Sequence, residues 1–180
     1  INSMAADAEL NFAGALQLLN HYTDEDFAEV ERMEGAIDRY EDILGTYLVK
    51  LTGRELTSRQ SADVSKFLHT LSDFERISDH ALNVAEAAQE LKNKDITFSG
   101  DAQHELSVLT AALREILHNA IRAFIMEDLE LAKRVEPLEE LIDALCDEMK
   151  LHHVDRLQKG TCTLLQGFVF NDLLTNYERV

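Results

Sequence analysis

The stretch from Asp73 to Glu90 holds no glycine and no proline, and it most constrains what this chain can fold into. Such a stretch favours one continuous helix, in which side chains four residues apart share a face. The whole chain of 180 residues contains only 7 Gly and 1 Pro, so few tight turns are expected. We therefore predict an all-α protein of long helices, with 46% hydrophobic residues to fill its core.

Apolar residues recur at the helical period along the chain, and they predict six helices. The expected helices cover about residues 5–20, 24–51, 58–91, 101–126, 128–157 and 162–180. Thr23 can cap the second helix, and Thr57 or Ser58 the third. Pro137 lies inside the fifth, where its missing amide donor predicts a kink or a late start.

Two segments of the chain recur at nearly the same spacing. Met33 to Asp38 resembles Leu138 to Asp143, an offset of 105 residues from Glu34 to Glu139. Leu71 to Ile77 resembles Leu174 to Val180, an offset of 103 residues from Glu75 to Glu178. Two independent segments at nearly one offset predict a duplicated unit. We expect two tandem antiparallel three-helix bundles related by internal repeat, formed by residues 1–94 and 101–180.

The repeated segments carry carboxylates four residues apart, which one helix face would present together. Neighbouring helices of a bundle can bring two such pairs face to face, and four carboxylates suit iron, manganese, magnesium or calcium. The candidate metal ligands are Glu34, Asp38, Glu75, Asp79, Glu139, Asp143 and Glu178. A single pair is more often a solvated or arginine-paired surface, and Arg76 and Arg179 keep that alternative open.

The charge balance excludes several classes of partner. The chain has 34 acidic against 17 basic residues and a net charge of −17. Nucleic acids and anionic membrane surfaces are bound through basic residues, so neither is expected here. No apolar run approaches the ~18 residues of a membrane-spanning helix. Cys146 and Cys162 form no Cys-x-x-Cys motif or disulfide framework, which favours a reducing cytosol.

No catalytic constellation stands out in the sequence. A ferritin-like di-iron centre needs two Glu-x-x-His motifs, and only Glu115 to His118 matches. A zinc site formed by His152, His153 and Cys162 has no support from the residue spacing. His80 follows Asp79 and points about 100° away from it around the helix, where it is a candidate outer-shell partner. We predict that the chain is not an enzyme.

The segment from Glu75 to Glu86 resembles the hallmark of PhoU domains, which reads close to E-R-I-G-D-H-A-x-N-I-A-E. Ser78 stands here where the family usually has glycine. PhoU proteins are two repeated three-helix bundles, and their carboxylate motifs hold multinuclear clusters, often of iron or zinc. The resemblance therefore implies the same seven ligands as the duplicated motifs. Gly35, between Glu34 and Asp38, costs ~1 kcal/mol relative to Ala inside a helix, and we expect it to permit a close helix approach.

The end of the chain carries a second resemblance. Arg156 to Cys162, followed by Gly167 to Val180, is similar to the PhoU-like tail of bacterial sodium/phosphate cotransporter family proteins. The start without Met and the end inside a helical pattern favour an excised fragment. The resemblance implies the soluble domain of a membrane protein, on the cytoplasmic side of the plasma membrane. Its expected partner is the transport domain of the same polypeptide or a phosphate-signalling protein, and a homodimer stays open.

We thus expect a non-enzymatic regulatory or accessory domain of a phosphate transport system that binds metal through its carboxylate rows. The alternatives are a free-standing PhoU-type regulator of phosphate uptake and a helical interaction module without metal. If metal binds, Glu75 and Asp79 are expected to bind it first, because the second half ends at Val180, before the counterpart of Asp79.

Overall fold

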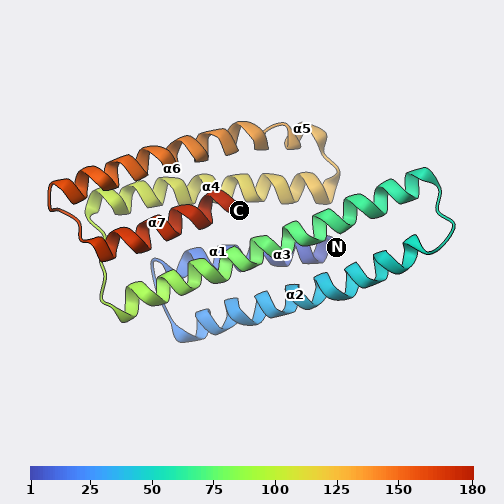
Figure 1. Ribbon diagram of the computed structural model, residues 1–180, viewed down its shortest axis with the longest axis horizontal. Helices are drawn as coiled ribbons and strands as arrows, with labels where there is room; N and C mark the ends of the chain where they lie inside the picture. The colour runs from blue at the N-terminus through green and yellow to red at the C-terminus, as the bar shows by residue number, and fades with distance from the viewer.

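A computed structural model describes all of residues 1–180, and every regular element in it is a helix (Figure 1). The all-α prediction is therefore confirmed. Six long helices and one short one follow each other along the chain. They are α1 (Asn2–Leu18), α2 (Asp24–Thr52), α3 (Ser58–Asn93), α4 (Gly100–Met126), α5 (Leu129–Ala132), α6 (Val135–Gln158) and α7 (Leu164–Arg179).

The helices begin where side chains can satisfy their first free amides. The Thr23 hydroxyl accepts a hydrogen bond from the Asp26 amide, as expected for the start of α2. Thr57 caps α3 and forms a reciprocal capping box with Gln60, so Thr57 rather than Ser58 is the cap. Thr163 begins α7 in the same way, which places the start of that helix at Leu164 instead of Cys162.

The helix that contains Pro137 begins late, as the sequence predicts. A single turn, α5, ends at Ala132, and α6 starts at Val135. Pro137 is thereby the third residue of α6, where no amide donor is needed within the helix. One continuous helix over residues 128–157 is wrong for this reason, because a proline is tolerated in a first turn but clashes one turn further along.

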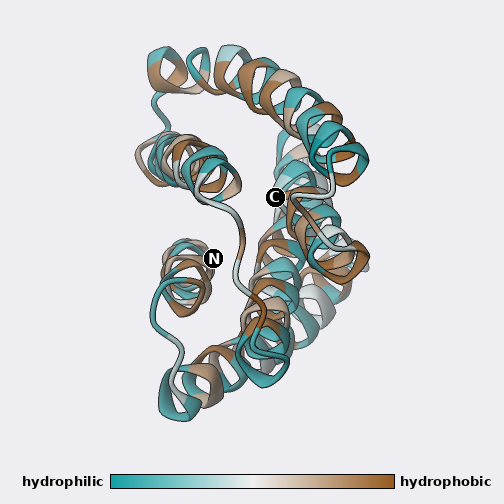
Figure 2. Ribbon diagram, turned by 90° about the vertical axis from the view of Figure 1, so that its left-hand side faces the viewer, coloured by the Kyte–Doolittle hydropathy of each residue, from teal (hydrophilic) through white to brown (hydrophobic).

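The six long helices form two three-helix bundles, one of α1, α2 and α3 and the other of α4, α6 and α7 (Figure 1). The bundles lie side by side, with α1 against α4 and α3 against α7 (Figure 2). The linker between α3 and α4 leads from one bundle to the other. Tandem three-helix bundles are thus confirmed, while the division at residues 94 and 101 into folding units stays a prediction.

One hydrophobic core of 31 buried residues runs through both bundles. Phe12 of α1 packs edge-on against Tyr177 of α7, with ring centroids 6.5 Å apart. Phe74 of α3 meets Phe124 of α4 in the same manner at 5.2 Å. Burying an aromatic side chain contributes about 1.5–3 kcal/mol, so these pairs hold the bundles together by joining α1 to α7 and α3 to α4.

A candidate carboxylate site between the second and third helices

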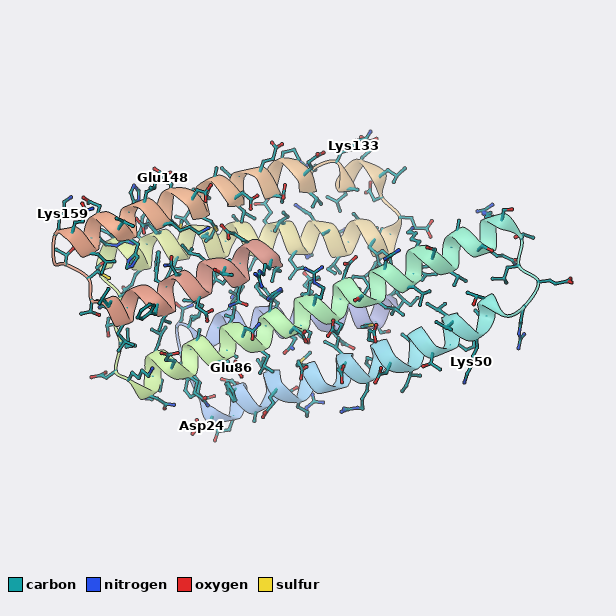
Figure 3. The ribbon with its side chains drawn as sticks, in the orientation of Figure 1. Asp24, Lys50, Glu86, Lys133, Glu148 and Lys159 are labelled. Carbon is teal, nitrogen blue, oxygen red and sulfur yellow. The ribbon has the colours of Figure 1, made fainter.

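Four of the predicted ligands gather where α2 and α3 pack against each other. Glu34 and Asp38 come from α2, and Glu75 and Asp79 from α3. Oxygen-tipped side chains fill the strip between these two helices in Figure 3. Glu34, Glu75 and Asp79 are half-buried, and Asp38 is exposed. The structure therefore places the whole first-half set on this pair of packed helices, and its use as a metal site stays a prediction.

Among these carboxylates the pKa shift is largest at Glu75. Burial raises the pKa of its carboxyl from an ordinary 4.5 to about 7, with Asp79 adding to the rise through its charge and a hydrogen bond. Glu41 and Asp38 raise the pKa of Glu75 further. A carboxyl among carboxylates keeps its proton longer because a second negative charge nearby is unfavourable. The site therefore holds more negative charge than it can neutralise by itself.

Glu34 shows the same effect from the side of α2. Burial first, and then the charges of Asp79 and Asp38, raise its pKa above the ordinary value. Arg39 lowers the pKa of Glu34, but the opposing causes outweigh it. Because Asp79 acts on both Glu34 and Glu75, charges from both helices converge on a single site.

None of these four carboxylates takes part in an ion pair. Arg76, which follows Glu75 in the sequence, is exposed and forms no ion pair either. Arg76 therefore does not pair with these acids, and a solvated carboxylate face stays the alternative to a metal site. Carboxylate oxygens are the donors that hard cations prefer. No group of three or more His, Cys, Asp or Glu side chains is, however, already arranged to hold a metal ion.

The second half does not reproduce this site. Glu139 and Asp143 on α6 and Glu178 on α7 are all exposed. Lys150 of α6 donates a hydrogen bond to Glu178 and forms an ion pair with it. This contact raises the pKa of Lys150, which keeps the ammonium charged. The duplicated carboxylate set is thus partly neutralised by a residue of its own bundle.

Lys150 explains the difference between the two halves. The offset of 105 residues that relates Glu34 to Glu139 relates Gly45 to Lys150. The first half therefore has a glycine where the second has its neutralising lysine, and a side chain added at Gly45 would meet nothing within 4 Å. The repeated motifs indicate neither Lys150 nor Glu41, although Glu41 lies one helical turn beyond Asp38.

His80, His118 and His153 take part in contacts outside the carboxylate site. His80 is buried and its Nδ1 lies 3.0 Å from the Asn176 Oδ1, so it joins α3 to α7 rather than supporting the carboxylates. His118 contacts Glu9 at 2.8 Å, which places it in a surface pair across α1 and α4. Cys162 lies 3.6 Å from His153 Nδ1 with the charge of Arg156 nearby, a poor setting for a zinc ion.

The distinctive tail residues build the corner between α6 and α7. Gly160 has a φ of +68°, a left-handed conformation that glycine adopts without strain. A Cβ at Gly167 would overlap the His153 ring, so only glycine allows the two helices to approach this closely. Phe170 lies under the Arg156 guanidinium, 5.3 Å from the ring centroid. Arg156 also bonds Glu105 of α4 at 2.9 Å, which ties three helices together.

Known proteins share this sequence pattern. The chain matches the PhoU domain family over residues 1–88 and 106–180. It belongs to the PhoU domain family. The match spans both bundles and includes all seven predicted ligands, and only the junction between the bundles lies outside it. The hallmark residues from Glu75 to Glu86 therefore mark a PhoU domain in this chain.

Individual relatives agree with the family. The "Phosphate-specific transport system accessory protein PhoU homolog 1" of Thermotoga maritima is 28% identical over 109 residues, which are 61% of this chain and 46% of that protein. The matched segment thus spans about half the length of this relative.

Two crystal structures share the fold. PhoU from Pseudomonas aeruginosa superposes with a TM-score of 0.90 at 18% identity, over 98% of this chain and 84% of that one. The phosphate transport system regulatory protein PhoU from Streptococcus pneumoniae gives 0.83 at 17% identity, over 99% and 83%. None of the helices of this PhoU domain combines the length and apolar character needed to cross a lipid bilayer.

Proposed function

We propose that this chain is a regulatory or accessory part of a phosphate transport system and does not itself catalyse a reaction. Membership of the PhoU domain family supports this, together with the transport-system name of the Thermotoga maritima relative. The site supports the same proposal. Its carboxylates carry an excess of negative charge, which suits a bound cation rather than a nucleophile and general base beside a reactive pocket.

The observation that carries the proposal is the unpaired set of Glu34, Asp38, Glu75 and Asp79, with the pKa of Glu75 raised to about 7. A bound cation would remove the repulsion among these groups. It would also tie α2 to α3, since two ligands come from each helix. Cation binding would in this way set how firmly the α2–α3 hairpin is held, and a hairpin that changes stiffness is a means of signalling to a partner.

We propose a metal ion as that cation, with Glu75 and Asp79 as the first ligands. Iron, manganese, magnesium and calcium suit the all-oxygen donor set, and zinc accepts carboxylates as well. Glu139, Asp143 and Glu178 form a weaker second site, because Lys150 competes for Glu178. The parent protein we propose is a sodium/phosphate cotransporter family member, on the strength of its tail residues. The domain would then act on the attached membrane domain from the cytoplasmic side.

A free-standing regulator of the same family is the second candidate, supported by the fold of the two bacterial PhoU structures. One experiment distinguishes a metal-binding role from that of a purely structural module. The purified chain is loaded with each metal in turn, desalted, and analysed for bound metal and for its melting temperature. We expect stoichiometric metal and a raised melting temperature.

Glu75→Ala and Asp79→Ala should both lose the metal and the added stability. Glu140→Ala is the control, since it removes an exposed carboxylate of α6 that belongs to neither proposed metal site. Metal retained in the Glu75 and Asp79 variants, or a melting temperature that rises equally in all of them, would contradict a metal role for this site.

A further inference from the structure

A groove between the two bundles has the size and lining of a ligand site. It encloses about 750 Å³ where the C-terminal ends of α1 and α3 meet α4 and the linker before it. Pockets for small ligands measure about 300–1,000 Å³ and combine apolar walls with a few convergent polar groups. Figure 2 shows α1 and α4 together on one side of the molecule, with the linker crossing beside them.

The two walls of the groove differ in chemistry. Leu19, Tyr22, Leu91, Ile96 and Phe98 are half-buried apolar residues of the walls outside α4, and they leave part of their surface facing the opening. Half-buried side chains of this size are expensive to leave in water, at roughly 25 cal/mol for each Å² of apolar surface. This side of the groove therefore favours an apolar body.

The wall formed by α4 carries a row of polar residues beside Leu106 and Ala111. Gln103, Ser107, Thr110 and Arg114 line the groove at spacings of three and four residues, so they follow one face of that helix. Arg114 stands at its end and also lines a smaller cavity of about 270 Å³ beside Glu9 and His118. Gln103 already donates to the Phe98 carbonyl and Thr110 bonds the Tyr177 hydroxyl, so the row leads to Arg114 as the polar group left for a ligand.

Arg114 and Lys92 are unpaired cations in a strongly acidic protein. Neither takes part in an ion pair, although the chain has twice as many acidic as basic residues. Asp95 is the single acidic residue that lines the groove with them. The field of the remaining carboxylates is screened over about 8 Å at physiological salt, so the local guanidinium decides which charge the groove accepts.

We propose that this groove binds a small amphiphile, with its apolar body against α1 and α3 and an anionic head group at Arg114. A carboxylate, sulfonate or phosphate head would accept the paired donors that a guanidinium offers. The site is separate from the carboxylates between α2 and α3, and the inference does not depend on the metal proposal. It gives this fold a place where a metabolite could act on the contact between the bundles.

Isothermal titration calorimetry with dodecanoate, below its micelle concentration, tests the proposal. We expect saturable binding of one molecule per chain, and much weaker binding of dodecyltrimethylammonium, which has the same apolar body and the opposite charge. Arg114→Glu should weaken the binding of dodecanoate by at least about ten-fold, which is the effect of losing a charged hydrogen bond. Arg59→Glu makes the same charge change at an exposed position in the first turn of α3 and should leave the affinity unchanged.

Ala111→Trp supplies a second test that keeps the charge of Arg114. Ala111 is exposed and lines the groove, so a large side chain there fills the cavity without disturbing the core. Binding should disappear while the melting temperature stays near that of the wild type. Absence of saturable binding, equal affinity for both amphiphiles, or equal affinity in the Arg114 and Arg59 variants would overturn the proposal. Glu75→Gln should bind dodecanoate normally, which keeps this outcome distinct from that of the metal experiment.

Discussion

Glu75 shows how burial and neighbouring charges bring the titration of an ordinary carboxyl close to neutral pH. Its half-buried position and the charges of Asp79, Glu41 and Asp38 raise its pKa to about 7. Near neutral pH the Glu75 carboxyl is therefore only partly ionised, and a cation that arrives competes with its proton. The same helix position in the second half, Glu178, has Lys150 beside it instead.

Glu75→Gln should stabilise the protein at alkaline pH. A folded-state pKa raised from 4.5 to about 7 means that the native state binds a proton more tightly than the unfolded chain. The stability that this proton supports is present below pH 4.5 and is lost as the pH rises through 7. The neutral glutamine removes that loss, which after discounting solvent screening is on the order of 1 kcal/mol at pH 8.

Urea unfolding of both proteins at pH 5 and pH 8 measures this effect. The two unfolding free energies should differ more at pH 8 than at pH 5. Glu139→Gln, at the exposed counterpart of Glu34, controls for removing one charge from an acidic chain. A pH dependence that is the same in wild type and Glu75→Gln would show that Glu75 has an unperturbed carboxyl.

Gly45→Lys should give the first half the neutralising residue of the second. A lysine at this position has open space around it and would reach toward Glu75 as Lys150 reaches Glu178. We expect the pKa of Glu75 to fall and metal binding to weaken, while stability rises by about 1 kcal/mol because a helical glycine is replaced. Gly45→Gln separates the two effects, since it changes the backbone in the same way without a charge. Carbon-13 NMR of the Glu75 carboxyl follows the titration, and an unchanged pKa in Gly45→Lys would contradict the comparison of the two halves.

At the scale of whole helices, the glycines divide into those required by a contact and those that are not. Gly35 was expected to permit a close helix approach, and this is wrong. A Cβ at that position would meet only the Arg39 side chain of the same helix, at an ordinary 3.6 Å. Gly167, in contrast, faces the His153 ring so closely that no side chain fits.

Gly35→Ala and Gly167→Ala should therefore have opposite effects. The first should stabilise the protein by about 1 kcal/mol, because alanine loses less backbone freedom in a helix. The second should destabilise it by about 1–3 kcal/mol, because the crossing of α6 and α7 must open. Thermal unfolding of the two variants beside the wild type measures both. Similar shifts of the same sign would mean that the α6–α7 crossing is looser than the contact with His153 indicates.

The helices themselves could be predicted from the sequence, because each depends on local signals. Thr23 and Thr57 cap their helices as expected, and Pro137 delays the start of α6 as its chemistry requires. The position of the first-half carboxylates on facing helices could also be predicted, since α2 and α3 are joined by a short turn and must pack antiparallel. The neutralisation of Glu178 could not, because it depends on the packing of α6 against α7, which is set by contacts between residues far apart in the chain.

At the scale of the whole molecule, the two bundles share their interior. The His80–Asn176 hydrogen bond and the Phe12–Tyr177 contact both cross between them. A repeat in the sequence predicts two units, yet it carries no information about how much surface they bury against each other. The core of 31 residues contains members from every long helix, which makes the six long helices one packed body.

This shared core predicts that the protein unfolds in one transition. Phe12→Ala removes a fully buried ring from α1 that touches α7, and such truncations cost about 3–5 kcal/mol. If the bundles are coupled, the lost stability lowers the free energy of unfolding of both equally, because neither stays folded without the other. Hydrogen exchange followed by mass spectrometry in increasing urea should then show peptides of α2 and of α6 losing protection together, in the variant as in the wild type. Leu10→Ala, at an exposed position of the same helix, should leave both transitions where they are. Protection lost first in α2 and at higher urea in α6 would show that the two repeats fold as separate units, as their sequences alone suggest.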